Sequence, residues 1–234
     1  MRLEIITLNT MTDNKEKQTE KKFEEVEIAL TRTEQFVEKN QRSIVVVAIA
    51  IIVIAAIIWI VNSLYLTPRK YDAQKEMFCA QYYFEADSFS LALNGDGMNA
   101  GFLQIIEDYG STPAGRLAQY YAGICYINLG QYDSALLHLR AFSSDDETLT
   151  AFSYGLVGDA ESELGNTKEA IAAYQKAINT KNKIAAPIFL LKLAALYELS
   201  EQGEKAKQSY EQIKKEYPLS PQAGLADKFI SAIK

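Results

Sequence analysis

Residues that carry acid–base, nucleophilic or metal chemistry are few in this chain of 234 residues. The one histidine, His138, has no nucleophile near it in the sequence, and the two cysteines, Cys79 and Cys125, form no CxxC pair. A catalytic triad needs a histidine beside a nucleophile, and most zinc sites gather several Cys or His ligands. The sequence therefore predicts a protein that is not an enzyme, with no metal site and no cofactor.

Two acidic stretches resemble parts of metal sites. Asp145, Asp146 and Glu147 lie between two expected helices and begin the second of them, where acidic side chains are stabilised by the positive end of the helix dipole. Asp96, in the turn-like segment NGDGMN, lacks the later glutamate and the alternating carboxylates of a calcium loop. We therefore expect a helix cap in the first case and a turn in the second.

The two cysteines lie in apolar stretches with helical spacing. Cys79 and Cys125 therefore suit small buried positions in a helical core. A disulfide bond between them remains the alternative if this part of the chain faces an oxidising compartment.

The helices that position these residues follow one long apolar run. Ile44 to Val61, IVVVAIAIIVIAAIIWIV, holds 18 residues and no charge. About 20 apolar residues in a helix cross the hydrocarbon core of a bilayer. Trp59 and Tyr65 near its C-terminal end suit the membrane interface. We expect a single transmembrane helix at residues 43–66.

The segment before this run, residues 1–42, is a charged tail. The polar part of the tail begins at Met11. We expect Met11 to be the biological start of the protein and the first ten residues to be an upstream extension. A thin apolar stripe predicts a short amphipathic helix in the tail, formed by Phe23, Val26, Leu30, Thr33 and Val37.

Charge indicates the orientation. The tail carries eight Lys and Arg and is short enough for the positive-inside rule to apply. Residues 67–234 carry 16 Lys and Arg against 21 Asp and Glu, a net charge of −5. That acidic balance argues against nucleic-acid binding. We expect a cytoplasmic N-terminus and an external C-terminal domain of residues 67–234.

A repeat runs through this domain. Three windows, 122–142, 157–178 and 193–213, align with a period of 35 or 36 residues. They share a small residue, an alanine twelve positions later, and an apolar or aromatic residue four positions after that: Gly123, Ala135 and Leu139; Gly158, Ala170 and Tyr174; Ala194, Ala206 and Tyr210. Each window predicts two helices, helix A and helix B. One such pair cannot bury its own apolar face, so the pairs must stack.

The pattern resembles the tetratricopeptide repeat, whose order of small and aromatic residues appears at Gly123, Tyr126, Gly130, Tyr132 and Ala135. The second copy departs from it, with Glu161 and Thr167 at two aromatic positions. The resemblance implies an all-α fold, a solenoid of helix–turn–helix repeats after the transmembrane helix. We expect residues 69–110 to form a degenerate first pair, interrupted at Asn94–Met98, and residues 219–233 to form a last helix.

The layout of the whole chain narrows the resemblance. A short charged tail, one span and an external tetratricopeptide-like domain are similar to the bacterial YfgM-like family. That family implies a single-pass protein of the inner membrane with a periplasmic repeat domain. It also implies an ancillary role beside the Sec translocon and periplasmic chaperones, without a catalytic residue.

Helix A of each repeat is expected to line a groove that binds a protein or peptide. The candidate residues, from the repeat register, are Tyr120, Ile124, Ile127, Asn128, Phe152, Asp159, Ser162, Glu163, Leu191, Ala195 and Glu198. The lining is apolar at one end and acidic at the other, which suits an apolar or mildly basic segment. The Lys and Asn pattern of a C-terminal carboxylate clamp is not present. In the alternative interpretation these residues only complete the solenoid.

Two functions remain open from the sequence. The first is a non-enzymatic, membrane-anchored scaffold of the bacterial envelope that binds client polypeptides or partners near the translocon exit. The second is a structural subunit of a cell-wall or outer-membrane assembly complex that binds no client. The partner, the oligomeric state and the use of the groove are not specified by the sequence.

Overall fold

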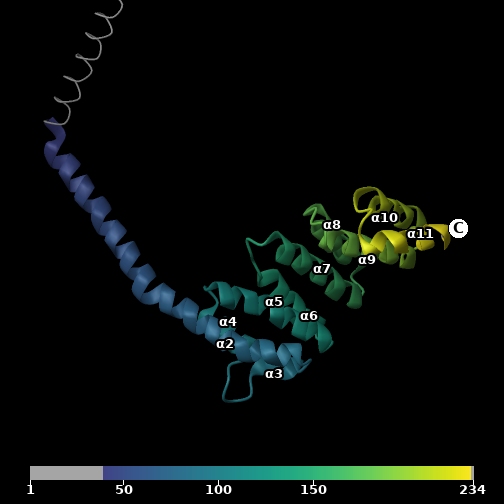
Figure 1. The fold of residues 1–234 in the computed structure, drawn as a ribbon, viewed down its shortest axis with the longest axis horizontal. Helices are drawn as coiled ribbons and strands as arrows, with labels where there is room; N and C mark the ends of the chain where they lie inside the picture. The colour runs from purple at the N-terminus through teal and green to yellow at the C-terminus, as the bar shows by residue number, and fades with distance from the viewer. Residues whose placement is uncertain (1–38, 233–234) are drawn as a thin grey trace, which may run out of the picture. The chain divides into compact units, whose positions relative to one another are not determined.

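A computed structural model describes residues 39–232 of the chain (Figure 1). The chain divides into two compact units between Ser63 and Leu64, and we describe each unit by itself. The amphipathic stripe of the tail and the start expected at Met11 lie outside the described residues.

The first unit contains the apolar run, and residues 39–60 are helical. The helix assignment extends from Lys39 to Glu85 and includes a π-helical segment, η1, at Val61–Leu66. An 18-residue window in it has a mean hydropathy of 3.5, and none of that window is buried. By length and composition this helix is a candidate membrane span, the one found among residues 39–232.

The second unit is built from α-helices, and no strand occurs in its described part. The prediction of an all-α helical-repeat fold is therefore confirmed. In chain order the helices are α2 (Thr67–Glu85), α3 (Phe89–Asn94), α4 (Phe102–Tyr109), α5 (Pro113–Asn128), α6 (Tyr132–Ala141), α7 (Glu147–Glu163), α8 (Thr167–Asn179), α9 (Ala185–Leu199), α10 (Gly203–Glu216) and α11 (Pro221–Ala232).

The helices form successive pairs, and each pair packs on the next (Figure 1). Helices α5, α7 and α9 are helix A of the three repeats found in the sequence, and α6, α8 and α10 are helix B. The last helix, α11, packs on α9 and α10 and closes the series, as expected for residues 219–233.

The turn between helix A and helix B has the same geometry in four places. Its central residue has a positive φ, of 53° at Asp87, 71° at Gly130, 77° at Gly165 and 57° at Glu201. The next residue donates its backbone N–H to a carbonyl five positions back, for example Asn166 to Glu161 at 2.9 Å. This arrangement satisfies the free carbonyl groups at the end of helix A. The fourth turn, at Asp87, identifies α2 and α3 as a further repeat pair.

Helix B of this first pair is split. It begins as α3, stops at a loop of residues 95–101, and resumes as α4, which packs on α5. The sequence predicted a degenerate pair interrupted near Asn94–Met98. The structure adds that the interruption produces two short helices in place of one.

Small residues on helix A let the helices pack closely. A Cβ atom at Gly158 would lie 2.5 Å from the ring of Tyr174 on α8, and one at Gly123 would lie 2.5 Å from Leu139 on α6. Gly155 on α7 meets the next repeat, because a Cβ there would lie 1.9 Å from the Phe189 ring on α9. The glycines therefore make room for side chains that fill the core.

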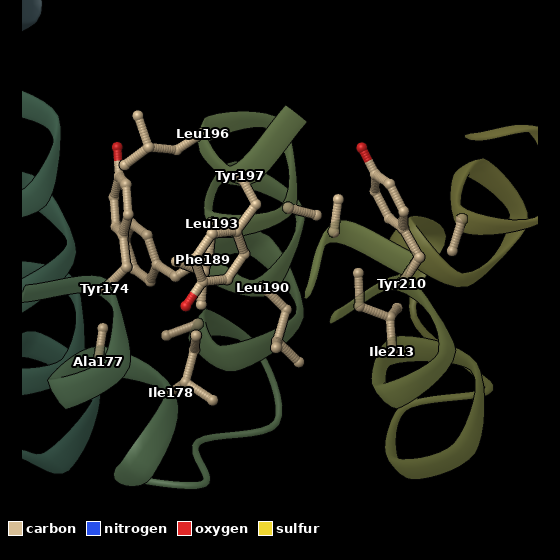
Figure 2. Packing of buried hydrophobic residues seen from close by; sticks show 14 of the residues in the cluster. Tyr174, Ala177, Ile178, Phe189, Leu190, Leu193, Leu196, Tyr197, Tyr210 and Ile213 are labelled. Atoms are coloured by element: carbon tan, nitrogen blue, oxygen red, sulfur yellow. The ribbon is translucent and has the colours of Figure 1, made fainter. Parts of the chain in front are cut away.

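The largest core cluster joins the last two repeats to α11 (Figure 2). Phe189 lies at its centre, with the Tyr174 ring stacked on it at 6.1 Å and the Phe152 ring edge-on at 5.7 Å. Tyr210 and Ile213 of α10 continue the cluster toward α11, where the Phe229 ring stacks on Tyr210 at 5.3 Å. The repeats are thus joined by aromatic side chains that bridge neighbouring helices.

We predict that Gly155→Ala destabilises the domain by about 1–3 kcal/mol, because the new methyl group overpacks the buried Phe189 ring. In an open helix the same change stabilises by about 1 kcal/mol, so the steric term must exceed this gain. Gly224→Ala is the matched control, since Gly224 lies in α11 with no atom within 4 Å of its Cβ position. Urea unfolding of both variants measures the difference. A Gly155→Ala variant as stable as Gly224→Ala would contradict the packing described here.

Candidate protein-binding site

The predicted groove residues lie on three neighbouring helices. Four are on α5, four on α7 and the rest on α9; α5 contacts α7, and α7 contacts α9. All of the candidates keep part of their surface exposed. Asn128, Glu163, Ala195 and Glu198 are exposed, and the half-buried members are Tyr120, Ile124, Ile127, Phe152, Asp159, Ser162 and Leu191.

The aromatic and aliphatic members also hold the repeats together. The Tyr120 ring lies 5.2 Å from the Phe142 ring, and burial raises the pKa of Tyr120 to about 12. Phe152 and Leu191 pack against the largest core cluster, and Ile127 packs against the cluster around α6. These side chains are therefore only partly exposed to solvent.

Asp159 is engaged on both sides. Its carboxylate accepts a hydrogen bond from the Tyr174 hydroxyl at 2.8 Å and binds the Lys192 ammonium group at 2.6 and 2.7 Å. The ion pair joins α7 to α9, two adjacent helices A, and the Lys192 side chain is 43% exposed. Burial and the nearby Asp159 carboxylate together raise the pKa of Tyr174.

The other acidic candidates have similar partners. Glu198 accepts a hydrogen bond from the Tyr210 hydroxyl at 2.9 Å, and Glu163 accepts one from Tyr132 at 3.4 Å. In each case a tyrosine of helix B donates to a carboxylate of helix A. The acidic end that the sequence predicted is thus partly satisfied within the fold. Lys192, which sequence reasoning missed, adds a positive charge there.

The two acidic stretches that resembled metal sites are structural. Asp146 caps α7, accepting from the backbone N–H groups of Thr148 at 2.7 Å and Leu149 at 3.0 Å, so the predicted cap is confirmed. Asp96 closes its own loop by accepting from Asn99 and Met98 and from the Tyr83 hydroxyl at 2.7 Å. The hydrogen bond from the Asn99 backbone contributes most to holding the pKa of Asp96 far below its usual range.

The histidine and the cysteines also lie in packed positions. His138 stacks on Tyr126 at 5.3 Å, with its Nδ1 atom 2.7 Å from the Gln119 side-chain oxygen, and burial lowers its pKa. Cys79 and Cys125 are free thiols, and burial raises the pKa of Cys125 to about 12. Within residues 39–232, no three His, Cys, Asp or Glu side chains come together as a metal site.

Among the hollows that lie away from the predicted groove, two are each found between two successive helices B. Cleft 1, of about 530 Å³, is formed by α6, α7 and α8 and includes Arg140, Glu161 and Lys176. Cleft 2, of about 360 Å³, is formed by α8, α9 and α10 and includes Gln175, Tyr197 and Gln212. The lining residues correspond through the repeat period, and none of the groove candidates belongs to either lining. The two clefts differ at Glu161 and Tyr197, which are equivalent positions in their linings. The sequence indicated this difference, because Glu161 departs from the aromatic pattern of the repeat.

We predict that Tyr174→Phe destabilises the domain by about 1–2 kcal/mol, because a hydrogen bond to a charged group is lost while the ring and the Lys192 ion pair remain. Tyr71→Phe is the matched control, because the Tyr71 side chain is 72% exposed. Thermal or urea unfolding measures both. Equal stability of the two variants would show that the Tyr174–Asp159 contact adds nothing.

A comparison with models of protein families agrees with this architecture. A family model described as "Tetratricopeptide repeat" matches residues 117–145 and 189–220. No curated protein matches the chain. Two similar solved structures are "Crystal structure of MamA" and "Crystal structure of MamA protein". The first is 25% identical, with a TM-score of 0.41, over 55% of this chain and 80% of that one. The second is 21% identical, with a TM-score of 0.49, over 67% and 81%. The family model and the helices together show that the chain carries tetratricopeptide repeats, and that the described part of their domain is all-helical.

Proposed function

We propose that this protein is a membrane-anchored scaffold that binds polypeptides through the helix A face of its repeats. The observation that carries the proposal is the row of partly exposed side chains on α5, α7 and α9. Tetratricopeptide solenoids use extended surfaces of this kind to bind proteins. The family match therefore supports an interaction protein over an enzyme.

The chemistry of the face favours a mixed segment. Tyr120, Ile124 and Phe152 give an apolar surface on α5 and α7, whereas Glu163 and Glu198 give exposed carboxylates. Lys192 is paired with Asp159, so the exposed carboxylates of Glu163 and Glu198 remain for a basic side chain of the ligand. An apolar segment with a basic residue fits this arrangement best.

The finer proposal places the scaffold in a bacterial inner membrane, with the repeat domain in the periplasm beside the Sec translocon and periplasmic chaperones. Its support is the charge asymmetry around the candidate span and the resemblance of the layout to the YfgM-like family. A structural subunit of an envelope complex, without client binding, is the competing function.

Photo-crosslinking in cells tests the groove. A photoreactive amino acid at Asn128 or Glu163 should yield adducts of many sizes together with a translocon subunit, because both positions are exposed on helices A. The same residue at Leu137, 69% exposed on helix B, is the control and should yield fewer adducts. Adducts are resolved by gel and identified by mass spectrometry. One discrete adduct without a translocon subunit would instead support the structural-subunit function.

A topology reporter tests the membrane orientation. Alkaline phosphatase fused after Lys234 is active only outside the cytoplasm, so we expect activity from the fusion to the full chain. Fusing green fluorescent protein at the same point is the matched control and should give little fluorescence. A fluorescent green fluorescent protein fusion together with an inactive phosphatase fusion would overturn the periplasmic location of the repeat domain. It would also overturn the role at the translocon exit.

A further inference from the structure

One position distinguishes the second repeat from the others. The residue whose carbonyl accepts the turn hydrogen bond is Tyr83, Tyr126 and Tyr197 in three of the four helix pairs, and Glu161 in the remaining pair. The shared turn geometry makes these four residues equivalent. A tyrosine is thus the rule at this position, buried at Tyr197 and half-buried at Tyr83 and Tyr126, and a carboxylate replaces it once.

In the last repeat the tyrosine fills its site. Tyr197 is buried, its hydroxyl lies 3.4 Å from the Gln175 amide nitrogen, and the Lys205 ammonium group lies over its ring at 5.6 Å. In the repeat before α7 the Tyr126 ring stacks on His138. Each ring therefore has a polar or cationic neighbour on its face or at its hydroxyl.

In the second repeat the same place is held by an ion pair. The Glu161 side chain, 3% exposed, binds Arg140 through one oxygen and accepts from the Asn166 amide through the other at 2.8 Å. Arg140 corresponds to Gln175, and its side chain is 58% exposed. The Arg140–Glu161 pair thus stands where Tyr197 stands one repeat later, and Tyr154 of α7 lines the same cleft.

Cleft 1 is the larger of the two equivalent hollows, at about 530 Å³ against about 360 Å³ for cleft 2. Two alanines contribute to the difference, since Ala172 and Ala173 stand where cleft 2 has Gln208 and Ser209. Its walls combine apolar and aromatic side chains with charges of both signs: Leu139, Phe142, Tyr154 and Val157 beside Arg140, Glu161, Glu169 and Lys176. Its volume lies within the range of small-ligand sites, about 300–1,000 Å³.

We propose that cleft 1 binds a tyrosine side chain of a partner polypeptide, whose ring lies beside the Arg140–Glu161 pair that replaces the tyrosine of the sister repeats. Two interactions recognise it. The exposed Arg140 guanidinium stacks on an aromatic face. The Glu161 carboxylate accepts from the phenol hydroxyl, as Asp159 and Glu198 accept from Tyr174 and Tyr210 within this fold.

Glu161 retains the capacity for this bond. A carboxylate has about four acceptor positions, and Arg140 and Asn166 each donate to one oxygen. A leucine or isoleucine of the partner would fill apolar space but leave that acceptor unused. The site therefore distinguishes tyrosine from aliphatic side chains. It shares no residue with the predicted groove, so it stands or falls independently of the function proposed above.

The test uses the full chain in detergent and two blocked peptides, acetyl-Gly-Tyr-Gly-amide and acetyl-Gly-Leu-Gly-amide, with binding measured by saturation-transfer NMR. We expect the tyrosine peptide to bind and the leucine peptide to bind at least about tenfold more weakly, which corresponds to about 1.4 kcal/mol. Equal binding of the two peptides, or no binding of either, would overturn the proposal.

Two variants fill the cleft in different ways. Glu161→Tyr restores the residue of the sister repeats, and Ala172→Gln introduces the side chain that stands at Gln208 while leaving the ion pair intact. Both should reduce binding of the tyrosine peptide by at least about tenfold. Ala172 is exposed, so its replacement leaves the core unchanged and remains informative if Glu161→Tyr fails to fold. Gln208→Ala in cleft 2 is the matched control and should bind as the wild type does. Wild-type binding by Ala172→Gln would place the peptide outside cleft 1.

Discussion

The close approach of helix A and helix B is the constraint on which the domain depends. Gly123 and Gly158 have no side chain, and the space that a Cβ atom would take is occupied by Leu139 and Tyr174. The side chain of helix B therefore packs directly on helix A, and in the second repeat its hydroxyl donates to Asp159, the residue after Gly158. The close approach of the two helices therefore accounts for both the packing and the hydrogen bond. If helix A and helix B were farther apart, both contacts would be lost.

This constraint explains why the helix A face is both a candidate binding surface and part of the core. Tyr120 and Phe152 must pack against neighbouring repeats, so only part of each ring remains exposed. The carboxylates of Asp159 and Glu198 are needed by the tyrosine hydroxyls of helix B. A ligand on this face therefore meets a surface whose side chains are already fixed in place. Such preorganisation lowers the entropy lost on binding.

The sequence predicted the repeats well where the period is regular. Ala135, Ala170 and Ala206 marked helix B correctly, because a small residue is required wherever two helices touch. The first pair was harder to recognise. Its loop of residues 95–101 is an insertion, which moves Ala92 out of the 36-residue register although Ala92 is as buried as the other three alanines. The turn at Asp87 also has no glycine, so its usual sequence signal is absent.

The candidate site was less predictable, for a different reason. The repeat register gives the face on which a side chain lies, but not the partner that it meets. The ion pair of Lys192 with Asp159 joins residues 33 positions apart, and that of Arg140 with Glu161 joins residues 21 apart. Both pairs connect successive helix pairs, so they depend on how the repeats stack. No pattern within a single repeat specifies such a contact.

Glu161 shows how a departure from a repeat pattern can be interpreted. A buried charge in place of an aromatic residue costs desolvation energy, and an ion pair often recovers no more than this cost. Three of the four helix pairs use tyrosine at this position, so a better-packed solution was accessible to the fold. The carboxylate therefore does not optimise packing, and sites where local rules are broken are often functional. The candidate membrane span makes such a site more useful, because a tethered domain meets membrane-bound partners at a high effective concentration. Weak binding of a single tyrosine side chain in cleft 1 can then help the domain select its membrane-bound partners. The same weak binding would give little selectivity between proteins that are free in solution.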